Sequence, residues 1–191
     1  MAARSIWSLG VRVSHTVEQA LSFIKAKPED ASLITALVNS AYRGDSSRAG
    51  WTSEADLFNG PRTDENEIRD LINSHESMFL LCIQATEIIG SVLLRRTGTT
   101  AYLGMLVISP RLQGAGIGSR LMAASESAAR NAWGIKKMSM TVIGCRHELI
   151  AFYERRGYRR TGQIEPLPLG GLSVPRIGNL ELEVLEKEFG E

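Results

Sequence analysis

The glycine-rich run QGAGIGS, residues 113–119, has the residue types and spacing that most clearly favour ligand binding. Pro110 ends an apolar run before it, and a helical pattern follows directly after it. The first N–H groups of a helix have no partner inside the helix, and the helix dipole adds partial positive charge there. Glycine lets the chain turn and lets an anion approach the backbone closely. The run therefore predicts a site for a phosphate or pyrophosphate group.

Two common nucleotide-binding loops do not fit this run. A P-loop needs a Gly-Lys pair, and the sequence contains none. The dinucleotide fingerprint is G-x-G-x-x-G, whereas this run reads G-x-G-x-G, and no βαβ unit precedes it. The remaining alternative is a tight strand-to-helix turn that binds no ligand.

A second block, LIAFYERRGYRRTG at residues 149–162, places the run in a family context. Residues 113–118 resemble the acetyl-CoA signature Q/R-x-x-G-x-G/A of the GNAT superfamily of N-acetyltransferases. The second block resembles the later F/L-Y-x-x-x-G-F/Y motif of that family, and residues 24–44 are similar to its first strand and helix. The resemblance extends over residues 21–188, and two motifs in the right order make it specific.

The resemblance implies an α/β (α+β) fold with a mixed, largely antiparallel central sheet of about six or seven strands and about four flanking helices. Hydrophobic periodicity and breakers agree with this layout. They predict a polar loop at residues 45–63 and a central helix at 116–133, whose apolar side holds Ile117, Leu121, Ala124, Ala128 and Ala132. The predicted strands are residues 21–27, 78–85, 87–97, 100–109, 136–144, 158–164 and 179–189, and the other predicted helices are 28–44, 64–76 and 146–157.

The resemblance also implies where acetyl-CoA binds as co-substrate. The strand before the glycine run is expected to splay from its neighbour at a bulge. There the backbone of Leu106, Val107 and Ile108 would bond the pantetheine arm and polarise the acetyl carbonyl. Backbone amides of the glycine run would hold the pyrophosphate, namely those of Gly114, Ala115, Gly116, Ile117, Gly118 and Ser119.

Two further side chains are expected at the cofactor. Gln113 would contribute hydrogen bonds to it. Arg146 stands where the family often has an asparagine that contacts the cofactor, and it could contact the cofactor or bind an acidic group of the acceptor. The neighbouring Cys145 could act as a nucleophile only with a histidine–acid pair, and none is evident.

Tyr153 matches the tyrosine that often acts as the general acid in this family. A thiol of pKa about 8.5 leaves readily, and a phenol of pKa about 10 can protonate it. The alternative is that Tyr153 only packs beside Phe152 and donates a hydrogen bond.

The general base has a weaker signal. Many relatives carry a glutamate on the splayed strand, but residues 100–109 contain no carboxylate. We therefore expect the loop at residues 45–63 to supply it, and Glu54 is the leading candidate because Trp51 lies close by in a potential pocket wall. The resemblance places the acceptor site at this loop, with Tyr42, Arg43, Arg48 and Trp51 as candidate residues.

Composition limits the other partners. The net charge of +1 gives no case for nucleic acid, and no apolar run reaches the about 18 residues of a membrane span. No HExxH motif or other cluster indicates a metal. Cys82 and Cys145 both lie in apolar surroundings, so we expect two reduced core cysteines and a cytoplasmic protein, either a monomer or a homodimer.

The chain is predicted to form a single acetyltransferase domain over residues 21–191, preceded by an extension over residues 1–20. The extension contains Arg4 and Arg12 and no acid before Glu18, a composition compatible with a mitochondrial targeting segment.

The predicted function is transfer of acetyl from acetyl-CoA to a primary amine, with a small molecule favoured as acceptor. A protein acceptor, at an N-terminus or a lysine, is an open alternative because the cofactor signature does not distinguish acceptors. A non-catalytic acyl-CoA-binding module is another, supported by the missing strand carboxylate and opposed by Tyr153.

Overall fold

The computed structural model describes residues 20–168 and 172–190; residues 1–19, which hold the possible targeting segment, lie outside them. The described helices are η1 (Pro28–Asp30), α1 (Ala31–Tyr42), α2 (Gly44–Arg48), α3 (Glu65–Asn73), η2 (Pro110–Leu112), α4 (Ile117–Trp133) and α5 (His147–Glu154). The strands are β1 (Leu21–Lys25), β2 (Phe58–Asn59), β3 (Ser77–Gln84), β4 (Glu87–Thr97), β5 (Thr100–Ile108), β6 (Lys137–Ile143), β7 (Arg159–Pro166), β8 (Val174–Pro175) and β9 (Glu181–Glu188).

Seven of these strands form one sheet in the order β1-β3-β4-β5-β6-β9-β7. Neighbouring strands are antiparallel except β5 and β6, which run parallel. The predicted mixed, largely antiparallel sheet of six or seven strands is confirmed.

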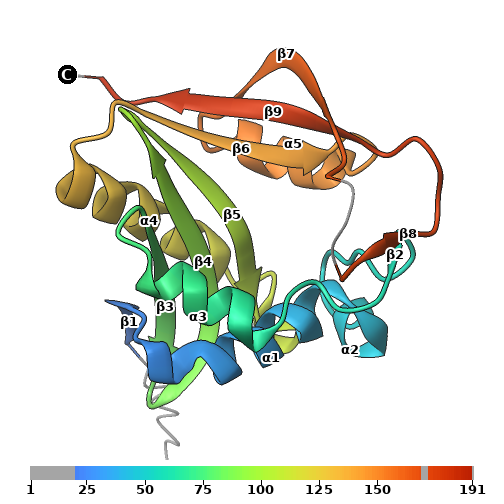
Figure 1. Cartoon of the computed structure of the whole chain (residues 1–191), viewed down its shortest axis with the longest axis horizontal. Coiled ribbons are helices and arrows are strands. Elements are labelled where there is room, and N and C mark those ends of the chain that lie inside the picture. The colour runs from blue at the N-terminus through green and yellow to red at the C-terminus, as the bar shows by residue number, and fades with distance from the viewer. Residues whose placement is uncertain (1–19, 169–171, 191) are drawn as a thin grey trace, which may run out of the picture.

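The parallel pair separates soon after it begins. Residues 100–102 of β5 pair with residues 137–139 of β6, and beyond them the two strands diverge, as Figure 1 shows. From there β5 pairs only with β4, and β6 continues to pair with β9. The inner edges of β5 and β6 therefore face each other across a wedge.

A β-bulge bends β5 at the start of this wedge. Gly104 pairs with Leu93 and Val107 pairs with Ser91, so β5 has one more residue than β4 between the two pairs. Met105 lies at the bulge with φ of 46°, a left-handed conformation that is uncommon for a non-glycine residue. A bulge leaves a residue unpaired and turns the strand, and here it turns β5 away from β6.

Helices cover both faces of the sheet. Alternate residues of a strand point to opposite faces, so Phe79 and Leu81 join one apolar cluster while Leu80 and Cys82 join the other. Helices α1 and α3 complete the first cluster, and α4 and α5 complete the second. The strands of the sheet are therefore held in place by helices packed on both of its faces.

Three local predictions need correction. Residues 45–63 are not all loop: they contain most of α2 and all of β2, which pairs with β8. The buried side of α4 is rotated from the predicted one, because Ala132 is exposed and the buried residues are Ile117, Leu121, Met122, Ser125 and Ala129. Cys82 is buried as expected, but Cys145 is exposed because it precedes α5 in a turn.

None of the helices in residues 20–168 and 172–190 has both the length and the apolar character needed to cross a membrane.

Replacing Leu121 with alanine tests the core under α4. Leu121 is fully buried, so we expect the free energy of unfolding to fall by about 2–5 kcal/mol because a cavity remains. Leu33 is 60% exposed, and Leu33→Ala should change it by less than about 0.5 kcal/mol. Urea denaturation measures both, and equal losses would contradict the packing of α4 on the sheet.

Candidate active site

Two cavities meet in the wedge between β5 and β6. The large cavity has a volume of about 640 Å³ and lies between β5, β6, the end of α1 and the segment before α3. The narrow cavity, of about 60 Å³, lies beside β5 beyond the bulge. We call their shared wall the junction; it consists of Tyr42, Glu54, Leu106, Arg146, Leu149 and Tyr153.

The narrow cavity contains most of the predicted pantetheine site. Leu106, Val107, Ile108 and Gln113 line it. Leu106 follows the bulge directly, so its backbone belongs to the part of β5 that has left β6. The strand segment expected to bind pantetheine thus borders a cavity that shares part of its lining with the larger one.

The glycine run has the predicted geometry at the N-terminus of α4. Gly114 and Gly116 have φ values of 84° and 78°, which favour glycine, and a Cβ on either would meet no atom within 4 Å. Within the described part of the chain, the N–H groups of residues 114–118 have no hydrogen-bond partner. These donors therefore surround open space at the positive end of the helix.

Both polar atoms of the Gln113 side-chain amide form hydrogen bonds within the protein. Its Nε2 donates to the carbonyl of Ile108 at 3.1 Å, and its Oε1 accepts from the N–H of Trp51 at 2.7 Å. A Cβ on Gly50 would lie 2.6 Å from this Oε1, so a larger residue there would displace the Gln113 amide. Gln113 joins the loop after α1 to the end of β5, a role that its sequence position did not suggest.

Arg156 is a cation beside the glycine run that the sequence analysis missed. Its guanidinium donates to the hydroxyl of Ser119 through Nε at 3.1 Å and also through Nη2, and it lies 3.4 Å from the centre of the Phe152 ring. No carboxylate lies within ion-pair distance in the described residues. The family motif leaves this position variable, so only the fold reveals its proximity to α4.

Glu54 lies at the junction between two arginines. Its Oε2 is 2.7 Å from Nη1 of Arg43 and its Oε1 is 2.8 Å from Nη1 of Arg146. All three residues are less than 10% exposed. Arg43 also donates to the hydroxyl of Ser173 at 2.9 Å, and Arg146 donates to the hydroxyl of Thr52. We call Arg43, Glu54 and Arg146 the ion-pair cluster.

The ion-pair cluster has unused donors, and Glu148 lies 3.8 Å from Nε of Arg146, so a second carboxylate offsets its second arginine. The Nε atoms of Arg43 and Arg146 are buried and have no hydrogen-bond partner in the described residues. The cluster also joins distant segments, because Arg43 follows α1, Glu54 lies in the next loop and Arg146 precedes α5. It therefore connects the loop to the end of α1 and to the start of α5, across the wedge.

Tyr153 contributes the phenol of the junction. It is buried, and its ring packs edge-on against Phe152 with a centroid distance of 5.3 Å. Burial raises the pKa of Tyr153 well above its usual value, and nearby Tyr42 adds to the rise. Burial and the charge of Glu54 also raise the pKa of Tyr42, to about 12. Both phenols are therefore protonated at neutral pH and can donate a proton.

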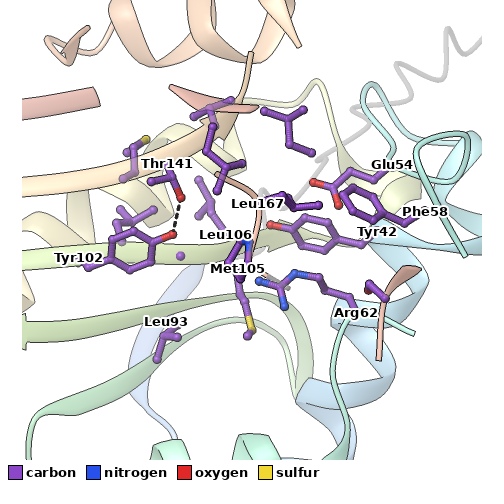
Figure 2. Close-up of a pocket in the computed structure, with 18 of the residues that line it drawn as sticks. Tyr42, Glu54, Phe58, Arg62, Leu93, Tyr102, Met105, Leu106, Thr141 and Leu167 are labelled. Atoms are coloured by element: carbon purple, nitrogen blue, oxygen red, sulfur yellow. Dashed lines mark hydrogen bonds between the residues drawn. The ribbon is translucent and has the colours of Figure 1, made fainter. Parts of the chain in front are cut away.

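The structure brings only part of the predicted acceptor set to the large cavity. Tyr42 and Arg43 line it, as does Glu54, and Figure 2 shows Tyr42 and Glu54 on one side with Tyr102 opposite. Arg48 lines neither cavity and is bonded to Asp56 on the surface. Trp51 is 49% exposed and packs on Phe152, outside both cavities.

The large cavity also has walls that the sequence analysis did not predict. Arg62 lies with its guanidinium 5.8 Å from the centre of the Tyr42 ring, and Arg95 lies 5.6 Å from that of Tyr102. The hydroxyl of Tyr102 is bonded to that of Thr141 across the wedge at 2.8 Å. The apolar part of the lining includes Leu93, Leu103, Met105, Met140 and Leu182.

No group of His, Cys, Asp or Glu within residues 20–168 and 172–190 is arranged to hold a metal ion. The exposed Cys145 is not among the residues that line either cavity.

Solved structures share the fold at low sequence identity. A GNAT acetyltransferase from Elizabethkingia anophelis with acetyl-CoA bound is 17% identical, with 88% of this chain and 98% of that chain covered and a TM-score of 0.56. A spermidine N-acetyltransferase chimera from Vibrio cholerae and hSSAT is 16% identical, with 88% and 95% covered and a TM-score of 0.64. A ribosomal-protein-alanine N-acetyltransferase from Escherichia coli is 12% identical, with 90% and 96% covered and a TM-score of 0.67.

A sequence model of the acetyltransferase (GNAT) family matches residues 48–158, while no curated protein sequence matches the chain. The match spans more than half of the 191 residues and contains the bulged strand, the glycine run and Tyr153. Together with the mixed sheet and the wedge, it shows that the chain belongs to the acetyltransferase (GNAT) family, whose members are acyltransferases that transfer acetyl from acetyl-CoA.

Proposed function

We propose that this protein transfers the acetyl group of acetyl-CoA to the primary amine of a small molecule, by direct attack while both are bound. The observation that carries the proposal is the junction, where a narrow cavity beside the splayed strand and a 640 Å³ cavity share Tyr153 and five other lining residues. A cavity of this size suits a small ligand. The relatives of known structure act on polyamine and protein acceptors alike, so the acceptor is inferred from the cavity alone.

The residues of the glycine run and the narrow cavity fit acetyl-CoA. The unpartnered N–H groups of residues 114–118 would hold the pyrophosphate, and the guanidinium of Arg156 beside Ser119 would add positive charge. The narrow cavity along residues 106–108 would hold the pantetheine arm. When bound, acetyl-CoA supplies a thioester whose carbonyl carbon accepts the amine nitrogen and whose sulfur departs.

In this transfer, the charges that line the cavity would act on the attacking amine, and Tyr153 would act on the departing sulfur. The amine must arrive unprotonated, and the large cavity, lined by four arginines and three carboxylates, disfavours an ammonium ion. The new C–N bond replaces the C–S bond, Tyr153 gives its hydroxyl proton to the departing sulfur, and the amine releases one proton. The phenol then regains a proton from water in the large cavity.

Glu54 has a clearer structural role than a catalytic one. Each of its oxygens already accepts from a guanidinium, so we propose that Glu54 positions Arg43 and Arg146 and closes the loop over the wedge. Its assignment as general base stays a prediction. The two roles predict different pH dependences of kcat/KM when Glu54 is replaced by glutamine.

Substituting Gly116 tests the phosphate cradle. Gly116→Asn should weaken acetyl-CoA binding at least about tenfold, because asparagine tolerates a positive φ but places a side chain in the open space before α4. Gly134→Asn is the matched control, since Gly134 also has a positive φ with no atom within 4 Å of an added Cβ, but it lies at the other end of α4. Calorimetry measures the affinity, and a folded Gly116→Asn protein that binds as tightly as wild type would rule out the cradle.

Removing the Tyr153 hydroxyl tests the acid. Tyr153→Phe should lower kcat at least about 100-fold while leaving the acetyl-CoA affinity within about threefold. Because the pKa of Tyr153 is raised, the protonated and active phenol persists to high pH, and wild-type kcat should show no loss from this group below about pH 10. A free-thiol assay against a panel of amines and peptides measures kcat. Unchanged turnover in the variant would remove Tyr153 from the chemistry, and absence of thiol release with every acceptor would indicate a binding module.

The variant Glu54→Gln distinguishes positioning from base catalysis. Loss of the carboxylate leaves the buried Arg43 without an ion-pair partner and Arg146 with only the more distant Glu148, so we expect the free energy of unfolding to fall by about 3–5 kcal/mol. Asp56→Asn, which removes an exposed ion pair in the same loop, should have no measurable effect.

The pH dependence of kcat/KM completes this test. If Glu54 positions the arginines, the ratio of wild-type to Glu54→Gln activity stays constant as the pH rises. A ratio that falls toward one at high pH, where the amine loses its proton unaided, would identify Glu54 as the base.

A further inference from the structure

Some arginines of the large cavity form ion pairs with carboxylates of the protein, and others do not. Arg43 and Arg146 are both paired with Glu54. Arg62 and Arg95 have no carboxylate within 4.0 Å and no side-chain hydrogen bond in residues 20–168 and 172–190. Arg95 is exposed at the rim, whereas Arg62 is half-buried. Arg62 is thus a cation that lines the cavity without an internal counter-charge.

The protein holds Arg62 in place through its backbone. Asn39 of α1 accepts from the N–H of Arg62 at 2.7 Å and from that of Thr63 at 3.3 Å, and it donates to the carbonyl of Thr63 at 2.9 Å. The guanidinium lies over the ring of Tyr42 and points into the cavity, as Figure 2 shows. A long side chain positioned in this way loses little further freedom when it binds a ligand.

The carboxylates nearest in sequence are engaged elsewhere. Asp64 accepts from the N–H of Glu67 at 2.8 Å and caps α3, and Glu67 accepts from the hydroxyl of Thr63 at 2.6 Å. Counted over its whole lining, the cavity has four arginines and three carboxylates. It therefore has an excess of positive charge, and Arg62 is the half-buried part of that excess.

We propose that Arg62 binds a carboxylate of the acceptor, so that the acceptor is an amino acid or a related amino carboxylate and not a polyamine. The planar guanidinium presents paired donors that match a carboxylate, whereas a polyamine would bring like charge to it. The apolar wall of Leu93, Leu103 and Met140 would receive the hydrocarbon part of such a molecule. This inference rests on the proposed transfer to a small amine and adds the class of that amine.

Matched acceptors test the assignment in the free-thiol assay with acetyl-CoA. Each series contains an amino acid, its primary amide and the amine that lacks the carboxyl group: phenylalanine, phenylalaninamide and phenethylamine, then leucine, leucinamide and isopentylamine. Spermidine is added as the polyamine. We expect kcat/KM for the amino acid to exceed that of both analogues at least about tenfold in one series or both.

The variant Arg62→Ala should remove this preference. We expect kcat/KM for the amino acid to fall about 10- to 100-fold, mainly through KM, and that for the analogues to stay within twofold. The matched control is Arg69→Ala, since Arg69 is exposed, pairs with Glu65 and lies outside the cavity. The assignment would be overturned if the amides, the amines or spermidine were turned over as well as the amino acids or better. It would also be overturned if Arg62→Ala lowered kcat/KM equally for every acceptor.

Binding measurements separate this inference from the proposed reaction. If no amine releases thiol, calorimetry with the same compounds still reports the site. Tighter binding of the amino acids than of their amides, lost in Arg62→Ala and kept in Arg69→Ala, would uphold the carboxylate site and reject the transfer. Equal binding of all three members of each series, without thiol release, would overturn both the carboxylate site and the proposed transfer.

Discussion

β5 and β6 pair over only three residues each before they separate, and both cavities of the site exist because of that separation. The bulge at Met105 adds one residue to β5 and turns it away from β6. Because helices pack on both faces of the sheet, the wedge cannot close by collapse of the strands. β5 then leads through η2 into the glycine run, and Gln113, directly before the glycines, lines the narrow cavity.

Ion pairs and side-chain hydrogen bonds connect segments on the two sides of the wedge that the sheet does not join. The ion-pair cluster joins three segments that are far apart in sequence, and Gln113 ties the same loop to β5. A buried ion pair contributes less to stability than its geometry suggests, because both charges lose their water. The cluster is better understood as a set of contacts that fixes the loop against α1 and α5.

The sequence predicted what depends on local pattern. Strand alternation, the proline after β5 and the glycine run placed the strands and the start of α4 close to where they lie, whereas Leu106, Val107 and Ile108 were expected at the cofactor only from the family resemblance. Gln113 and Glu54 were expected at the site, but their partners Trp51, Arg43 and Arg146 follow from the folding of the loop over the wedge. Arg62 and Arg156 were missed for the same reason, since neither has a motif and only tertiary packing brings them to a cavity or to α4. The buried side of α4 was misjudged because alanine fits either a core or a surface and so gives little directional signal.

The central claim is that the thioester and the amine meet at the junction and react there directly, without an acyl-enzyme. Initial rates measured while both acetyl-CoA and an acceptor amine are varied test it most directly. The account predicts double-reciprocal lines that intersect, because both molecules must be bound before any product leaves. Parallel lines would contradict it, since they would require acetyl to reside on the protein between two separate half-reactions.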